Sequence, residues 1–224
     1  MSWSFAAPAF QKTHSVWAVD LPGHGVAGND VGSGLVEDLA EAVKREIIET
    51  ISGPIALLAH SLGGAVAIQL AHDSDIAVSQ LVLLAPAGVL PLTDTDFVSG
   101  FSKLESVDTI SKHLKRAVRR EKIITNSMAD YVRSSLQTAG RRRALEKLAS
   151  AATTSALIPE IRHDRLTCIW GEDDTIIKPD QPRLTALFDD LHMLPNIGHL
   201  PHLEATQKVC RIAQAALAAM GSLD

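Results

Sequence analysis

A single serine stands where an apolar strand gives way to an apolar helix. The run Ile55 to Ala59 is typical of a buried parallel strand, and Leu62 to Ala71 is typical of a buried helix. Ser61 lies between them, in the sequence Ala59-His60-Ser61-Leu62-Gly63-Gly64. A chain that turns at once from strand to helix has room only for small residues at the bend. We therefore expect the serine hydroxyl at the carboxyl end of the strand, beside the free N–H groups of the helix amino terminus.

This arrangement resembles the nucleophile elbow of the α/β-hydrolase superfamily, G-x-S-x-G, with Ala59 in place of the first glycine. The resemblance implies that Ser61 is a nucleophile and that the N–H of Leu62 contributes to an oxyanion hole. The alternative interpretation of the motif alone is a serine that caps a buried helix.

Two later strand ends supply a candidate acid and a candidate base. Leu166 to Trp170 and Leu191 to Leu194 are short apolar runs, which predict buried parallel strands. Asp174 follows the first run, and His199 follows the second on a loop. The order Ser61, Asp174, His199 is the order Ser, acid, His of the hydrolase family, and other serine triads run in different orders.

The acid has rivals next to it in the sequence. Asp173 is the stronger rival and Glu172 the weaker one. Asp174 is preferred because the family pattern at this strand end is G-x-x-D.

The chemistry explains why these three residue types belong together. A serine hydroxyl is a poor nucleophile at neutral pH, so an imidazole must take its proton as it attacks a carbonyl carbon. The carboxylate fixes the imidazole tautomer and stabilises the imidazolium that forms. The sequence therefore predicts a serine hydrolase acting on an ester, thioester or carbon–carbon bond of a small acyl substrate. The substrate-binding residues stay unknown.

The chain alternates between predicted strands and helices, which favours an α/β fold with a predominantly parallel sheet and helices on both faces. Further predicted elements are a strand at Ser15 to Asp20, a helix at Leu35 to Ile51 and a strand at Gln80 to Ala85. Residues 90–163 break the alternation and are helical in character. We expect a hydrolase core at 1–89 and 164–224, with a helical cap at 90–163.

A closer resemblance is to the hydrolase-type C-terminal domain of acetoin dehydrogenase acetyltransferase (E2) subunits. It spans roughly Trp17 to the C-terminus and is carried by Leu81 to Gly88, Asp96 to Phe101, Glu105-Ser106 and Ile169 to Asp174. Those subunits pass an acetyl group from a lipoyl arm to coenzyme A. Because no lipoyl domain or Pro/Ala-rich linker precedes the fold, we expect hydrolysis. Acyl transfer of the E2 type and a non-catalytic ligand-binding role are the alternatives.

The resemblance also implies a difference at the N-terminus. Family members precede the region Asp20 to Gly25 with a buried strand and a His-Gly loop that donates one oxyanion-hole amide, and the sequence begins too late to contain either. The absence of this strand would leave a gap one strand wide, about 4.8 Å. Either Met1 is a late start of an ordinary hydrolase, or the strand at Ser15 to Asp20 moves over and pairs with the nucleophile strand. With the N–H of Leu62 as the one identifiable donor, we expect weak activity.

Charge and size narrow the function further. The 224 residues, 46% of them hydrophobic, can bury the core of one enzyme-sized domain, and the net charge of −5 argues against a nucleic-acid partner. Residues 100–147 hold 12 of the 21 Lys and Arg but 5 of the 26 Asp and Glu, a local charge of about +7. A basic cap would steer an anionic substrate. The alternative is a set of solvated helix faces.

No metal, cofactor, disulfide or membrane segment is expected. His199 and His202 are three residues apart, but no further ligands follow at metal-binding spacing. Cys168 and Cys210 are expected to be reduced core residues. The N-terminus lacks the basic region of a secretory signal, and no apolar run would span a bilayer, so the expected location is cytoplasmic.

Overall fold

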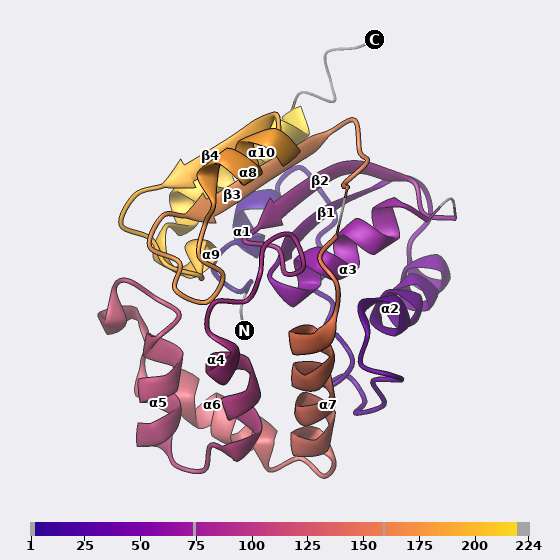
Figure 1. Ribbon diagram of the computed structural model, residues 1–224. Coiled ribbons are helices and arrows are strands. Elements are labelled where there is room, and N and C mark those ends of the chain that lie inside the picture. Colours follow the sequence, from indigo (N-terminus) through magenta and orange to yellow (C-terminus); the bar gives the residue numbers. More distant parts are fainter. Residues whose placement is uncertain (1–2, 74, 159, 219–224) are drawn as a thin grey trace.

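Four strands that follow one another along the chain form one parallel sheet in a computed structural model that describes residues 3–73, 75–158 and 160–218 (Figure 1). The strands lie side by side in the order β1-β2-β3-β4, and every neighbouring pair is parallel. Parallel neighbours need a crossover connection, which helices supply. Their bounds are β1 (Ile55–His60), β2 (Val78–Leu84), β3 (Leu166–Gly171) and β4 (Asp190–Leu194). The predicted α/β class is therefore confirmed.

Alternate residues of β2 pack into two different cores, one on each face of the sheet. Leu81 and Leu83 join the core that contains Leu184 of α8 and Ile68 of α3. Val82 and Leu84 join the opposite core with residues of α1 and α10. Burial on both faces explains why the second half of the strand, Leu81 to Leu84, is an unbroken apolar run. The bounds of the four helices are α1 (Ala7–Phe10), α3 (Leu62–Ala71), α8 (Gln181–Leu187) and α10 (Thr206–Ala218). The short helix α9 (Pro201–Glu204) precedes α10.

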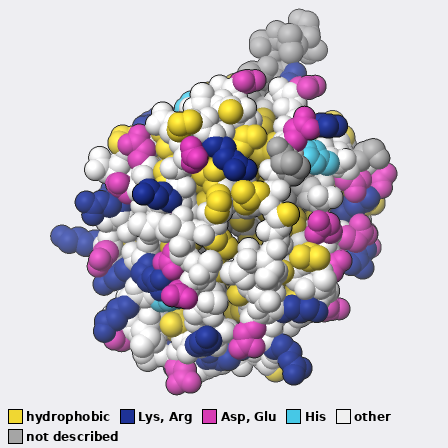
Figure 2. Space-filling view, in the orientation of Figure 1, with side chains coloured by type: hydrophobic (Ala, Val, Ile, Leu, Met, Phe, Trp, Pro, Cys, Tyr) yellow, Lys and Arg dark blue, Asp and Glu magenta, His cyan; other side chains and the backbone are white. Residues whose placement is uncertain are grey.

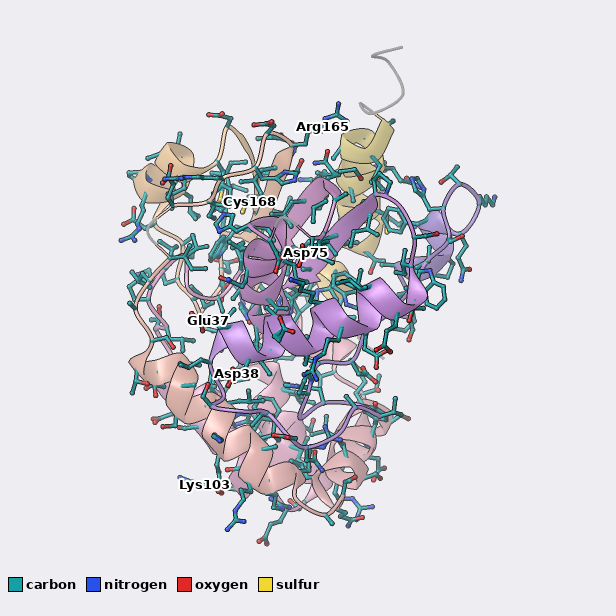
Figure 3. All side chains as sticks on the ribbon, turned by 90° about the vertical axis from the view of Figure 1, so that its right-hand side faces the viewer. Glu37, Asp38, Asp75, Lys103, Arg165 and Cys168 are labelled. Atoms are coloured by element: carbon teal, nitrogen blue, oxygen red, sulfur yellow. The ribbon has the colours of Figure 1, made fainter. Side chains whose placement is uncertain are left out.

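Helix α2 (Val36–Thr50) forms an outer layer on α3. Its apolar stripe, Leu39, Val43 and Ile47, is buried against Val66 and Leu70. Its opposite face is solvent-exposed, with Glu37 and Asp38 at the amino end, where the helix dipole favours negative charge (Figure 3). None of the helices in the described part of the chain is long and apolar enough to cross a membrane.

Residues 90–163, named the helical segment below, contribute a group of helices beneath the sheet in Figure 1. Ser106 begins α5 with a capping box, and Thr125 caps α6, so polar residues define these helix starts. The division into a core and a cap at the stated boundaries stays a prediction. The elements are α4 (Thr95–Gly100), η1 (Phe101–Lys103), α5 (Val107–Lys115), η2 (Glu121–Ile123), α6 (Asn126–Leu136) and α7 (Arg141–Thr154).

The predicted strand at Ser15 to Asp20 is wrong. These residues form no regular element, and their side chains are exposed, 59% in the case of Trp17. The idea that this stretch pairs with the nucleophile strand is wrong too, because the described neighbour of β1 is β2 alone. A strand needs a partner ladder as well as suitable residues. Strand β1 therefore lies at an edge of the sheet.

Candidate active site

Ser61 occupies a strained turn between β1 and α3. Its backbone has φ 50° and ψ −120°, a conformation that a residue with a side chain rarely adopts. Neighbouring chain holds it there: Ser61 N–H donates to Leu84 O at 3.0 Å, and Ser61 O accepts from Ala87 N–H at 2.9 Å. The end of β2 thus fixes the serine that follows β1.

Close packing explains one of the two glycines after the serine. A Cβ atom on Gly64 would lie 2.7 Å from Pro86 Cβ, so a side chain there would push α3 away from the loop after β2. A Cβ on Gly63 would meet nothing within 4 Å. Helix α3 begins at Leu62, and the first N–H groups of a helix have no intrahelical acceptor. The Leu62 N–H is therefore available beside Ser61.

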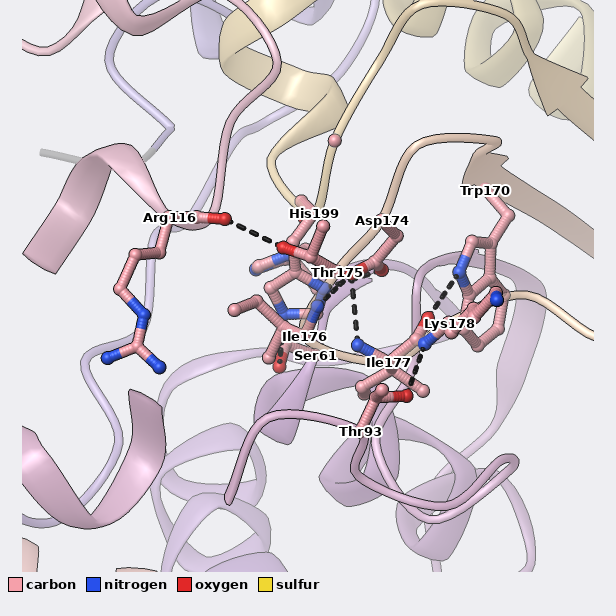
Figure 4. Close-up of polar contacts among 12 residues, drawn as sticks. Ser61, Thr93, Arg116, Trp170, Asp174, Thr175, Ile176, Ile177, Lys178 and His199 are labelled. Atoms are coloured by element: carbon pink, nitrogen blue, oxygen red, sulfur yellow. Dashed lines mark hydrogen bonds and ion pairs between the residues drawn. The ribbon is translucent and has the colours of Figure 1, made fainter. Parts of the chain in front are cut away.

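The structure brings together Ser61, His199 and Asp174, named the candidate triad below (Figure 4). The Oγ of Ser61 lies 3.0 Å from Nε2 of His199, and Nδ1 of His199 lies 2.8 Å from Oδ2 of Asp174. Asp174 is 2% exposed and His199 4%, so the contact between them is shielded from water, while the contact between His199 and Ser61 is partly buried. Such a chain of hydrogen bonds lets the imidazole accept a proton from the hydroxyl while the carboxylate orients it.

Backbone groups orient the carboxylate of Asp174. Its Oδ1 accepts hydrogen bonds from Ile176 N–H at 2.9 Å and Ile177 N–H at 3.0 Å, leaving Oδ2 for the histidine. Asp173 instead pairs with Arg119 at 3.6 Å, and its side chain is 43% exposed. Of the three neighbouring carboxylates, Asp174 is the one that contacts the imidazole.

His60, the residue before the serine, contacts the backbone of His199. Its Nε2 lies 2.7 Å from His199 O. Since a carbonyl oxygen only accepts, we assign the proton to this nitrogen. Burial holds the pKa of His60 well below its usual value, and the nearby His202 and His199 act in the same direction. His60 is therefore a neutral donor at neutral pH.

A row of rings continues behind His60. The centroid of the His60 ring lies 4.8 Å from the centroid of His199 and 4.6 Å from the centroid of His202. The ring centroids of His202 and Trp3 lie 4.8 Å apart. Burial lowers the pKa of His202 to about 3. His202 is thus a neutral packing partner in this row.

The remaining sequence candidates occupy structural positions. Across the described ranges, no three or more His, Cys, Asp or Glu side chains gather in a way that could hold a metal ion. Cys168 and Cys210 are buried free thiols, and burial raises the pKa of both. Figure 3 shows Cys168 within the sheet.

Sequence reasoning missed two residues that contact the backbone around His199. One is His60, which stands at the variable position of the serine motif. The other is Glu204, whose carboxylate accepts from Gly198 N–H at 2.7 Å. Glu204 is a charged residue on the buried side of α9. A buried charge needs partners, and this is the signal that could have drawn attention to Glu204.

Comparison with known proteins assigns the family. The sequence profile of the alpha/beta hydrolase family matches residues 1–212. The chain belongs to this family.

Solved structures of other family members share the fold at low identity. A meta-cleavage product hydrolase from Pseudomonas fluorescens IP01 superposes with a TM-score of 0.82 at 19% identity, over 97% of this chain and 85% of that one. A 2-hydroxy-6-oxo-6-phenylhexa-2,4-dienoate hydrolase from Rhodococcus sp. RHA1 gives 0.80 at 18% identity, over 97% and 84%.

Two curated relatives are acetyltransferase components. The chain is 26% identical over 216 residues to the dihydrolipoyllysine-residue acetyltransferase component of the acetoin cleaving system of Pseudomonas putida. It is 23% identical over 210 residues to the corresponding component of Cupriavidus necator. These matches cover 93% and 91% of the chain. The chain spans 57% and 56% of the length of these relatives.

Proposed function

We propose that the chain is a serine hydrolase that cleaves an ester, thioester or carbon–carbon bond of a small acyl substrate. Ser61 is the nucleophile, His199 the general base and Asp174 the carboxylate that orients the base. One observation carries the proposal: a continuous line of hydrogen bonds runs from Ser61 Oγ through both ring nitrogens of His199 to Asp174. The strained backbone of Ser61 supports it, because such strain concentrates at active sites.

The reaction follows from these contacts. Ser61 Oγ bonds to the substrate carbonyl carbon while its proton moves to Nε2 of His199. The carbonyl electron pair moves onto oxygen, and the N–H of Leu62 stabilises that charge. Collapse of this intermediate breaks the scissile bond, and the leaving group takes the proton from His199. Water then attacks the acyl-enzyme by the same route and releases the acid.

The Leu62 N–H is the oxyanion donor that we assign within the described residues. Removal of one donor from an oxyanion hole typically lowers kcat by about 10²–10³-fold.

An anionic acyl substrate is the expected class. The helical segment is rich in Lys and Arg, and Figure 2 shows basic side chains spread over the lower part of the molecule, where α4–α7 lie in Figure 1. Acidic side chains are interspersed among them in Figure 2. A net positive field raises the local concentration of anionic substrate in a salt-dependent way.

The second candidate function is acyl transfer. It is favoured by the similarity to the acetyltransferase components of acetoin cleaving systems. The two reactions share the acyl-enzyme and differ in the acceptor, water or a thiol. Product analysis of an acyl thioester incubated with and without a second thiol separates them.

Covalent labelling of Ser61 tests the proposal. A fluorophosphonate probe reacts only with an activated serine, so we expect labelling of the wild type and none of Ser61→Ala. Ser134→Ala, which changes an exposed serine of α6, is the matched control and should label like the wild type. Equal labelling of Ser61→Ala would mean that another serine is the activated one, which would contradict the proposal. No labelling of the wild type would favour the non-catalytic alternative.

A further inference from the structure

Glu204 is a buried carboxylate whose contacts are backbone N–H groups. It ends α9, is 3% exposed, and both of its oxygens accept hydrogen bonds. Oε1 accepts from Gly198 N–H at 2.7 Å, and Oε2 accepts from Arg119 N–H and Arg120 N–H, each at 2.9 Å. Burying a carboxylate is costly unless it is bonded in this way. The three backbone N–H groups therefore compensate for the burial of the Glu204 carboxylate.

These three bonds connect two segments that are far apart in the sequence. Gly198 precedes His199, while Arg119 and Arg120 belong to residues 116–120, named the α5–η2 loop below. The segments touch closely: a Cβ on Gly198 would lie 2.8 Å from Ala117 O and 3.0 Å from Arg119 N. Glycine is required at this contact.

The same loop also touches the other parts of the candidate triad's framework. Ala117 O accepts from His199 N–H at 2.8 Å, and Arg116 O accepts from Thr175 Oγ–H at 2.8 Å, next to Asp174 (Figure 4). The loops that carry the base and the acid are thus both bonded to the α5–η2 loop. Glu204 is the side chain that ties this loop to the base.

We propose that Glu204 is a positioning residue for His199. The inference rests on the proposed function. The imidazole must keep contact with Ser61 on one side and Asp174 on the other, so the backbone that carries it has to stay in place. Glu204 holds Gly198, and through it His199, against the α5–η2 loop. A shift of about 1 Å in a reacting group can cost about 100-fold in rate.

Glu204→Gln removes one chosen contact. Oε2 accepts two N–H groups and Oε1 accepts one, so the glutamine oxygen will keep the two bonds to Arg119 and Arg120. Its NH₂ group then faces Gly198 N–H, and two donors cannot bond. The substitution keeps the side-chain volume and breaks the link to the base.

The first measurement is kinetic. We expect kcat for a p-nitrophenyl ester, and the rate of fluorophosphonate labelling, to fall about 10–100-fold in Glu204→Gln while KM changes little. Asp38→Asn makes the same carboxylate-to-amide change at α2, where Asp38 accepts from Ser33 N–H, and should react like the wild type. Thermal unfolding of each variant sets a temperature at which all are folded. Wild-type rates in Glu204→Gln would overturn the inference.

The second measurement does not need turnover. In a Ser61→Ala background, the proton on His199 Nδ1, bonded to Asp174, should give a strongly downfield NMR signal. We expect Glu204→Gln to shift or broaden this signal and Asp38→Asn to leave it unchanged. An unchanged signal in Glu204→Gln overturns the inference. If the wild type neither labels nor turns over but the signal responds, the proposed function fails and the positioning role stands.

Discussion

At the scale of single residues, the contacts of Asp174 determine what an isosteric substitution would do. In Asp174→Asn the amide oxygen should stay with Ile176 N–H and Ile177 N–H, because two donors point at that position. The NH₂ group would then donate to Nδ1 of His199 and drive the ring proton to Nε2, which could no longer accept from Ser61. We expect kcat to fall about 10⁴-fold, as it does when the acid of a serine triad becomes an amide.

Asp173→Asn provides the matched control for this prediction. Asp173 pairs with Arg119 on the surface and does not contact the imidazole. Its kcat should stay within about 2-fold of the wild type, since exposed ion pairs contribute little. If Asp173→Asn lost more activity than Asp174→Asn, the acid would have been assigned to the wrong residue.

At this scale, the sequence predicted which side chains of the candidate triad are neighbours, but it did not predict the side chain that holds the backbone around them. The order of Ser61, Asp174 and His199 predicted neighbours, and the structure places them within hydrogen-bond distance. Their catalytic roles stay a prediction. Glu204 escaped because its partners are backbone N–H groups, which are the same in every residue but proline and leave no mark on the sequence.

At the scale of elements, β1 has a fully apolar sequence up to His60 but an edge position. Strands that are apolar on both faces are usually interior strands of a parallel sheet. The apolar pattern of β1 is that of an interior strand, and the family resemblance predicts that Ser15 to Asp20 belongs to the sheet. Residue pattern alone cannot say which ladder a strand joins, since pairing depends on contacts between distant segments.

The edge position of β1 predicts an alternating pattern of amide hydrogen exchange. Ile55 N–H and Ser61 N–H donate toward β2, so the N–H groups of Leu57 and Ala59 point the same way. Those of Ala56 and Leu58 point outward, away from β2. We expect the outward amides to exchange at least about 10-fold faster than the inward ones, because they need no opening of the ladder.

Exchange measured residue by residue by NMR checks this pattern. Residues Leu81 to Leu84 of β2 are the internal reference, because they pair with β1 on one side and β3 on the other and should show uniformly slow exchange. Equal protection of all four β1 amides would mean that another segment covers this edge in solution.

At the scale of the whole molecule, the row of rings from Trp3 through His202 and His60 to His199 links the N-terminal residues, α9 and β1. His60 and His202 are neutral because burial lowers the pKa of each. In the unfolded chain both regain a pKa of about 6.5. Below that pH the unfolded state therefore binds protons that the folded state does not. The free energy of unfolding must decrease as the pH is lowered.

The size of this effect follows from linkage. With its folded pKa of about 3, His202 should remove about 2 kcal/mol from the free energy of unfolding between pH 8 and pH 5, with most of the loss below pH 6.5. His60 should lower the free energy of unfolding in the same direction, because burial lowers its pKa as well. Urea unfolding at both pH values measures it. His202→Asn should lose about 2 kcal/mol less than the wild type over this interval, whatever its stability at pH 8. His14→Asn, at an exposed position, should lose as much as the wild type. Equal losses in His202→Asn and the wild type would show that His202 takes up a proton in the folded protein, and the neutral row of rings would then be wrong.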